Sequence, residues 1–135
     1  RADDTFLMDS YACAVVKESM RMEPPAPILY REVVDGFRLG EFDLAANDGL
    51  WISPQLLHFD PRNFPDPHIF DPRRFRGATA SPIAYLPFGL GPRTCIGNRL
   101  SLLQMTLTLL EVEAGGKLAP SGEGVVFRFR RTSVV

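Results

Sequence analysis

Apolar residues recur at spacings of three and four in the segment IGNRLSLLQMTLTLLEVEA, which occupies residues 96–114. Leu100, Leu103, Leu107 and Leu110 form one stripe, and further leucines lie beside it. This spacing predicts a long helix. Because the helix would be apolar on most of its sides, we expect it to be buried, and the glycine pair that follows is typical of a helix end.

A second helix is predicted from about Asp9 to Met22. Its residues are mostly helix-compatible, and Asp9 or Ser10 can cap its start. The segment EPPAP at residues 23–27 then ends it, because proline cannot continue the hydrogen-bond ladder.

Between residues 28 and 52 the pattern changes to short extended pieces that are rich in β-branched and aromatic residues. The turn sequences DG at 35–36 and NDG at 47–49 separate these pieces, so the region predicts a small antiparallel sheet. The segment 124–135 alternates between apolar and polar residues and predicts an edge strand.

Residues 58–87 show neither the three-and-four spacing of a helix nor the alternation of a strand. Asp-Pro pairs recur there among phenylalanines, which places turn residues beside side chains that favour burial. A disordered linker would lack those aromatic residues. We therefore expect an irregular but ordered segment.

Charge and composition narrow the range of functions. Fifteen basic and sixteen acidic residues give a net charge of −1, which argues against nucleic-acid binding and against electrostatic attraction to anionic membranes. No apolar stretch is long enough to span a bilayer, and no signal-peptide pattern opens the chain, which begins with Arg1. We expect the 135 residues to be a piece of a longer protein.

The cysteines and histidines do not have the spacing of a structural zinc site. Cys13, His58, His68 and Cys95 lie far apart, without a C-x-x-C or H-x-x-x-H pattern. Two cysteines also cannot form a disulfide framework. Cys13 is expected to be an inert core thiol.

Cys95 has neighbours that point to metal ligation. It lies in FGLGPRTCIG, residues 88–97, where a glycine-rich and proline-rich loop meets the predicted long helix. Free backbone N–H groups and the positive end of the helix dipole favour a thiolate there. Glycines can adopt positive φ and let a flat cofactor approach the backbone, and Phe88 can shield the sulfur from water. On its own, a cysteine at a helix start is more often a small buried apolar residue.

The spacing F-x-x-G-x-R-x-C-x-G resembles the haem-binding loop of the cytochrome P-450 family, the haem-thiolate monooxygenases. It is formed by Phe88, Gly91, Arg93, Cys95 and Gly97. The resemblance implies that Cys95 is the axial ligand of the iron of haem b and that Arg93 pairs with a haem propionate. It also implies that Phe88 and the loop glycines, Gly89 among them, contact the cofactor.

Two further segments resemble the same family. Glu18 and Arg21 have the spacing of the E-x-x-R pair of its K helix, and FDPRRF, residues 70–75, is similar to its F-x-P-E-R-F segment. Arg73 stands where the family has glutamate. The resemblance implies a buried cluster of Glu18, Arg21 and Arg74 with a structural role. A lone E-x-x-R pair would otherwise be a surface ion pair.

The resemblance suggests two more haem contacts. Arg31 follows PPAPILY, where the family often has a second propionate-binding arginine, although it is equally compatible with an ordinary exposed strand residue. His58, in HFDP, stands where the family often has H-R-D-P. It either touches the haem edge or orders the irregular segment, and we favour the second role.

The implied fold class is α+β, mainly α. The resemblance covers about residues 11–111 and implies the C-terminal part of the cytochrome P-450 fold: K helix, small β-sheet, Pro-rich meander, cysteine loop and L helix. Residues 1–135 would then be the haem-binding part of one domain, truncated at the N-terminus and before the last β-hairpin of the family. The oxygen-activating helix of the family has no counterpart here.

The implied function of the parent protein is insertion of one oxygen atom from O2 into a small, hydrophobic organic substrate, with electrons from a ferredoxin or a flavin reductase. The piece alone would be inactive. One alternative is a related haem protein of peroxide-isomerase or peroxygenase type, and another is an incomplete haem-binding module. A thiol enzyme with Cys95 as nucleophile would need a histidine base that no motif supplies. Localisation stays open between a soluble bacterial enzyme and a membrane-anchored eukaryotic one.

Overall fold

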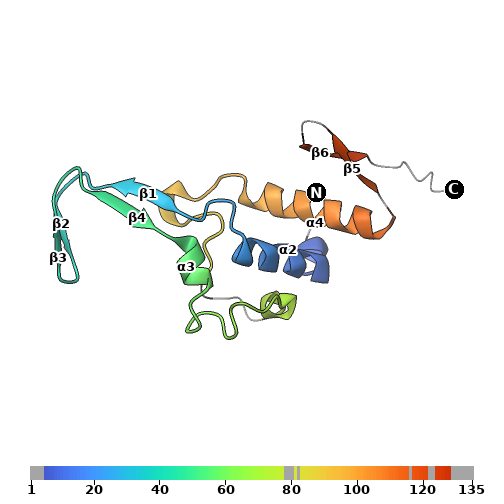
Figure 1. Cartoon of the computed structure of the whole chain (residues 1–135), viewed down its shortest axis with the longest axis horizontal. Helices are drawn as coiled ribbons and strands as arrows, with labels where there is room; N and C mark the ends of the chain where they lie inside the picture. The colour runs from blue at the N-terminus through green and yellow to red at the C-terminus, as the bar shows by residue number, and fades with distance from the viewer. Residues whose placement is uncertain (1–4, 78–80, 82, 116, 122–123, 129–135) are drawn as a thin grey trace.

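The computed structural model describes residues 5–77, 81, 83–115, 117–121 and 124–128. Its elements are α1 (Thr5–Met8), α2 (Tyr11–Met22), β1 (Leu29–Glu32), β2 (Phe37–Leu39), β3 (Phe42–Leu44), β4 (Gly49–Ile52), α3 (Pro54–His58), the 3₁₀ helices η1 (Pro72–Phe75) and η2 (Gly91–Arg93), α4 (Asn98–Glu113), β5 (Lys117–Ser121) and β6 (Gly124–Arg128). The molecule is elongated, with α2 and α4 in the middle and the β2–β3 and β5–β6 hairpins at opposite ends (Figure 1).

Helix α2 carries most of the core. Ser10 caps its start by accepting a hydrogen bond from the Cys13 N–H at 3.1 Å, and the helix ends before the predicted proline segment. Its buried side chains include two charged residues among apolar ones: Ala12, Cys13, Ala14, Val16, Glu18, Met20 and Arg21. Helix α2 packs against α1, α3, η1 and α4, so it is the element that joins the rest of the molecule.

The predicted sheet in residues 28–52 is two separate two-stranded sheets. Strands β1 and β4 pair antiparallel with Leu29 opposite Ile52, and β2 pairs with β3 with Phe37 opposite Leu44. Between them, the Asp48 N–H donates to the Ala45 carbonyl at 3.2 Å, and Asn47 has a positive φ of 70°. This turn lies at the predicted NDG sequence and separates β3 from β4, so the two pairs of strands form separate sheets.

The predicted C-terminal strand is β6, which pairs with β5 in an antiparallel hairpin. The rest of the predicted edge strand, residues 129–135, lies outside the described residues.

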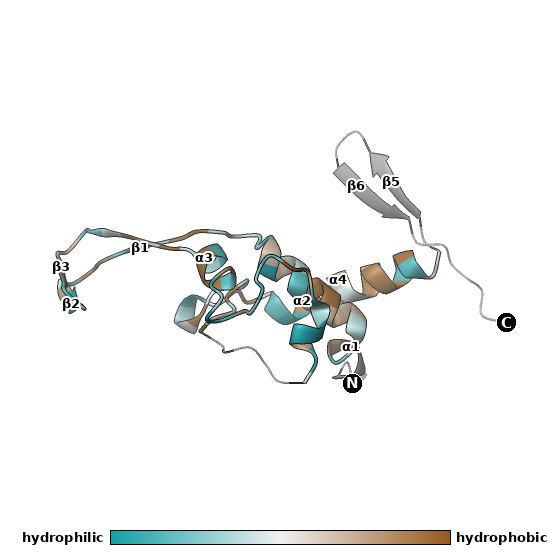
Figure 2. Ribbon diagram, turned by 60° about the horizontal axis from the view of Figure 1, so that its bottom comes forward, coloured by the Kyte–Doolittle hydropathy of each residue, from teal (hydrophilic) through white to brown (hydrophobic). Residues whose placement is uncertain are grey.

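Helix α4 forms where the leucine pattern predicts it, but the expectation that it is buried is wrong. Thr106 is its one buried residue among those described, while Leu100 and Leu107 are 67% and 47% exposed. Apolar residues line α4 on several sides (Figure 2), and the described part of the chain covers one of them, where α1 and α2 pack.

The irregular segment after α3 is ordered by aromatic packing, as predicted. Phe75 lies between Phe64 and Tyr85, with ring centroids 6.4 and 4.7 Å away. The Tyr85 hydroxyl donates a hydrogen bond of 2.8 Å to the Lys17 carbonyl of α2. Burial raises the pKa of Tyr85, so this phenol stays a neutral donor.

Candidate functional site

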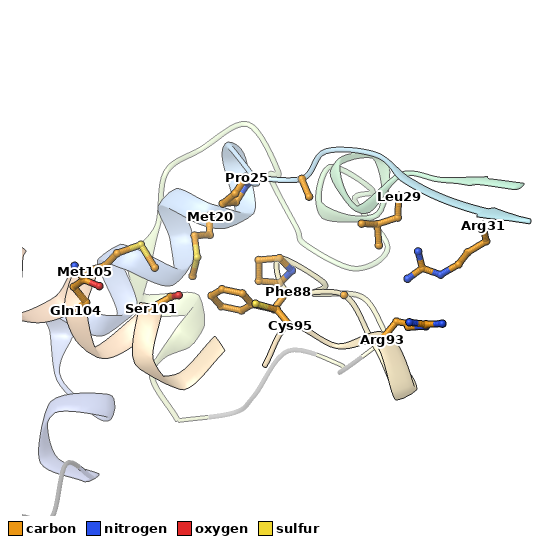
Figure 3. A pocket seen from close by; sticks show the side chains of 13 residues that line it. Met20, Pro25, Leu29, Arg31, Phe88, Arg93, Cys95, Ser101, Gln104 and Met105 are labelled. Carbon is orange, nitrogen blue, oxygen red and sulfur yellow. The ribbon is translucent and has the colours of Figure 1, made fainter. Parts of the chain in front are cut away.

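A cavity of about 650 Å³ lies between α2, β1, the cysteine loop and α4. Its lining is mostly apolar and comes from all four of these regions: Met20, Pro25, Ala26, Leu29, Arg31, Pro87, Phe88, Gly89, Arg93, Cys95, Ser101, Gln104 and Met105. Figure 3 shows Phe88 and Cys95 in the middle, with the α4 side chains to one side and Leu29, Arg31 and Arg93 to the other.

The cysteine loop is held by its own backbone. The Cys95 N–H donates to the Phe88 carbonyl at 2.9 Å, and the Thr94 N–H donates to the Gly91 carbonyl at 3.0 Å. Gly89 and Gly91 have φ of 73° and 74°, in the left-handed region that other residues adopt only with strain. The loop therefore needs glycine at these two positions to close on itself.

The Cys95 side chain is exposed toward the cavity and lies at the start of α4. A Cβ built on Gly97 would lie 3.9 Å from the Cys95 sulfur, so this sulfur lies beside the residue that caps the helix. The sulfur is thus accessible from the cavity and can act as a metal ligand.

Two arginines reach the same end of the cavity. Arg31 extends from β1 and Arg93 from η2, and Figure 3 places both on the side away from Met105 and Gln104. Arg31 is half-buried and donates a hydrogen bond of 2.7 Å to the Tyr30 carbonyl, whereas Arg93 is exposed. This end of an otherwise apolar cavity can bind carboxylates.

Glu18 and Arg21 form a fully buried ion pair on the other side of α2. Arg21 Nε donates to Glu18 Oε2 at 2.7 Å, and Arg21 Nη2 donates to Oε1 at 3.0 Å. The guanidinium also donates to the His58 carbonyl at 2.9 Å and lies 5.4 Å from the ring centroids of Phe59 and Phe64. Met20, the preceding residue, lines the cavity, so α2 separates the two sites.

Arg74 completes this cluster from η1. Its Nε lies 3.4 Å from Glu18 Oε1, and its Nη2 donates to the Asp66 carbonyl at 2.9 Å. The Asp71 N–H donates to Glu18 Oε1 at 2.8 Å. The three charged residues that the sequence grouped together therefore lie together, and they tie the irregular segment to α2.

His58 is not among the residues that line the cavity, and this departs from its assignment to the cofactor. Its side chain is fully buried at the end of α3, where the ring lies 5.3 Å from Tyr85 and 6.2 Å from Phe64. Burial first, and then the charge of Arg21, lowers the pKa of this imidazole below 6.5. The position fits the ordering role that the sequence favoured.

The remaining predicted residues are close to the cavity. Gly91 and Gly97 lie in the loop without lining it. Sequence reasoning missed Ser101, Gln104 and Met105, although they lie four, seven and eight positions after Gly97, a spacing that places them on one face of α4. In the described ranges, no group of three or more His, Cys, Asp or Glu residues could hold a metal ion by itself.

Comparison with known proteins agrees with these observations. Residues 8–112 match the family described as Cytochrome P450. The chain belongs to the cytochrome P450 family. The predicted fold class, a partial cytochrome P450 fold of mainly α character, is likewise confirmed by a solved relative. That structure, retinoic acid-bound cyanobacterial CYP120A1, has a TM-score of 0.71 and 30% identity, over 82% of this chain and 27% of the other.

The chain is 36% identical over 116 residues to Probable cytochrome P450 4d21 of Drosophila melanogaster, covering 83% of this chain and 23% of that protein. It is 43% identical over 105 residues to Thromboxane-A synthase of Rattus norvegicus, covering 76% and 20%. The chain thus spans between a fifth and a quarter of the length of these relatives. Within the described residues, no helix has the length and apolar character needed to cross a membrane.

The cavity fits the haem iron that this family uses. A thiol faces it from a helix start, two left-handed glycines shape the loop beside the thiol, and the walls are apolar. Two arginines lie at one end, where carboxylates would be neutralised. Among the residues that the structure describes, the cavity offers one soft sulfur ligand and no group of further metal ligands, which suits iron held mainly by a porphyrin.

Proposed function

We propose that this chain is the haem-binding part of a haem-thiolate monooxygenase that inserts one oxygen atom from O2 into an organic substrate. The exposed Cys95 thiol in the cavity supports this proposal most directly, because a sulfur at that place could bind an iron in the cavity without any movement of the fold. The proposal concerns the whole protein, of which this chain would supply one wall of the site.

Several residues of the cavity wall and of the cysteine loop would hold haem b. Cys95 would be the axial ligand, and its anionic form is favoured by the start of α4. Arg93 and Arg31 would bind the propionates, and Phe88 with Leu29 and Met20 would exclude water from the sulfur and the ring edge. Gly89, Gly91 and Gly97 would let the loop stay close to the ring plane. When bound, the thiolate-ligated haem supplies the oxygen-activating chemistry of this family.

The charged cluster contributes by position. Glu18, Arg21 and Arg74 lie across α2 from the cavity and join α2 to η1. They fix the wall on which the cavity is built and do not reach the cavity themselves. We assign them a structural role.

The proposed partners follow from the family. Its members in general use organic substrates and redox partners, and we propose an apolar substrate and a ferredoxin or flavin reductase as electron donor. A related haem enzyme that rearranges peroxides needs no electron donor. Oxygen-dependent turnover that requires reductant supports the monooxygenase, whereas turnover with a peroxide alone supports the other reaction.

Ligation by Cys95 is tested by replacing each cysteine in the full-length protein. The absorbance of the reduced, carbon monoxide-treated protein is expected to show the Soret position of thiolate ligation. Cys95→Ala should abolish this band, because it removes the only proposed iron ligand of the chain. Cys13→Ala is the matched control, since Cys13 is buried in α2 away from the cavity, and it should keep the band. A normal thiolate spectrum in Cys95→Ala would overturn the proposal.

A further inference from the structure

His58 connects α2 to the segment that leads into the cysteine loop. Its Nδ1 lies 3.0 Å from the Arg21 carbonyl, and the Leu86 N–H donates to its Nε2 at 2.9 Å. A carbonyl can only accept and a backbone N–H can only donate, so both contacts form only when Nδ1 carries the proton and Nε2 is unprotonated. The two contacts therefore select one neutral tautomer.

Two backbone hydrogen bonds link the segment at Leu86 to the cysteine loop. The Leu86 carbonyl accepts from the Gly89 N–H at 3.1 Å, and the Phe88 carbonyl accepts from the Cys95 N–H at 2.9 Å. On the other side, Arg21 Nη1 donates to the His58 carbonyl at 2.9 Å, so these two residues bond to each other in both directions. One imidazole thus joins the buried ion pair to the start of the cysteine loop.

The surroundings shield the two hydrogen bonds of the ring from water. His58 is fully buried, and Leu86 is 8% exposed, so water has little access to the Leu86 N–H. Phe64 and Tyr85 pack against the ring at centroid distances of 6.2 and 5.3 Å. A buried N–H that loses its acceptor carries the full desolvation penalty, so the loss of Nε2 would force the segment at Leu86 to move.

We propose that His58 is a positioning residue that holds the cysteine loop against α2, and that its Nε2 acceptor for the Leu86 N–H carries this role. The inference rests on the proposed function in that the loop presents the haem ligand. The geometry explains why a residue outside the cavity, remote in sequence from Cys95, would control how the sulfur is presented.

Two substitutions separate the two ring nitrogens. The side chain of asparagine reaches about as far as Nδ1, and that of glutamine about as far as Nε2. His58→Asn therefore keeps a donor for the Arg21 carbonyl and loses the acceptor for Leu86, whereas His58→Gln keeps an acceptor for Leu86. Both are made in the full-length haem protein, and His68→Gln, at an exposed histidine, is the control.

The readouts are amide hydrogen exchange of residues 86–95 and the fraction of the reduced, carbon monoxide-treated protein with the thiolate Soret position. In His58→Asn, exchange at Leu86 is expected to be about tenfold faster, the effect of losing one hydrogen bond, and the thiolate fraction should fall. His58→Gln should remain close to the parent protein in both. Equal behaviour of the two variants would overturn the inference, because it would mean that His58 only fills space.

The unsubstituted protein provides a test that does not depend on how well a variant folds. In its diamagnetic, reduced, carbon monoxide-bound form, ¹⁵N spectra of the histidine rings report which nitrogen carries the proton. We expect protonated Nδ1 and unprotonated Nε2 for His58 near neutral pH, and protonated Nε2 would overturn the inference. A parent protein that lacks the thiolate Soret band would refute the proposed function instead, and leaves the exchange comparison and the tautomer as tests of His58.

Discussion

The Glu18 carboxylate shows what a single residue does in this fold. It is fully buried, yet it accepts hydrogen bonds from Arg21 and from the Asp71 N–H, and Arg74 lies within ion-pair distance. A buried ion pair gives little net stability, but the loss of one partner leaves uncompensated charge in a low dielectric. The free energy of unfolding should therefore depend strongly on this carboxylate.

Glu18→Gln keeps the shape of the side chain and removes its charge, which leaves two arginines without their counterion. We expect the free energy of unfolding to fall by about 3–5 kcal/mol and haem content to fall with it. Urea unfolding and haem quantification of the full-length protein measure both. Asp43→Asn is the control, since its ion pair with Arg38 at 3.6 Å is largely exposed and should be worth about 1 kcal/mol or less. A variant that folds normally, holds haem and turns over slowly would give Glu18 a catalytic role.

At this scale the sequence was informative wherever a short motif fixes the spacing. The loop motif predicted Cys95 as the iron ligand and Arg93 as a residue that pairs with a haem propionate. The E-x-x-R spacing predicted that Glu18 and Arg21 share a face of a helix. The bond from Leu86 to His58 was not predictable, because it joins residues 28 positions apart through a segment without periodic structure. Its geometry depends on how aromatic rings pack around the imidazole.

At the scale of elements, local patterns predicted the two long helices α2 and α4 but not the short helices α1 and α3, and long-range contacts decided how the helices are covered. Ser10 and the proline segment define α2, and the leucine spacing defines α4. The burial of α4 was wrongly predicted, because a stripe of leucines does not say which surface covers it. The sheet was predicted as one and is two, because the turn that ends at Asp48 separates β3 from β4.

The cysteine loop is an element whose shape depends on a glycine. Gly91 has a φ of 74°, and a Cβ there would meet no atom within 4 Å, so Gly91→Ala tests strain without a clash. We expect the free energy of unfolding to fall by about 1–2 kcal/mol and the thiolate Soret fraction to fall with it. Gly40→Ala is the matched control for Gly91→Ala, because Gly40 also has a positive φ, of 61°, and equally open space, and it lies in the β2–β3 hairpin. It should show a similar loss of stability with an unchanged spectrum, and a spectral change in both variants would contradict the prediction.

For the whole molecule, the buried histidine makes stability depend on pH. His58 Nδ1 bonds to the Arg21 carbonyl of α2, the ring packs against Tyr85, and its folded-state pKa is lowered below 6.5 mainly by burial. Above about pH 6.5 the imidazole is neutral in both the folded and the unfolded chain, so it contributes no pH dependence. Between about pH 6.5 and the folded-state pKa, the unfolded chain binds a proton that the folded chain does not, and this favours unfolding.

We therefore expect the free energy of unfolding to decrease as the pH falls from about 6.5 toward the folded-state pKa of His58, by up to about 1.4 kcal/mol per pH unit. Urea unfolding at a series of pH values measures this slope. His58→Gln should remove it, and His68→Gln should leave it in place. An unchanged slope in His58→Gln would assign the effect to other groups.

The contacts that hold the cavity wall also set an order of events during synthesis. The Glu18 carboxylate accepts a hydrogen bond from the Asp71 N–H, 53 positions later in the chain. The Lys17 carbonyl accepts one from the Tyr85 hydroxyl, 68 positions later. Contacts of such sequence separation form slowly, since a long loop must close before any of them is gained. Helix α2 therefore leaves the ribosome well before the residues that bond to it, and on the proposed function haem would bind only after the cysteine loop has been synthesised.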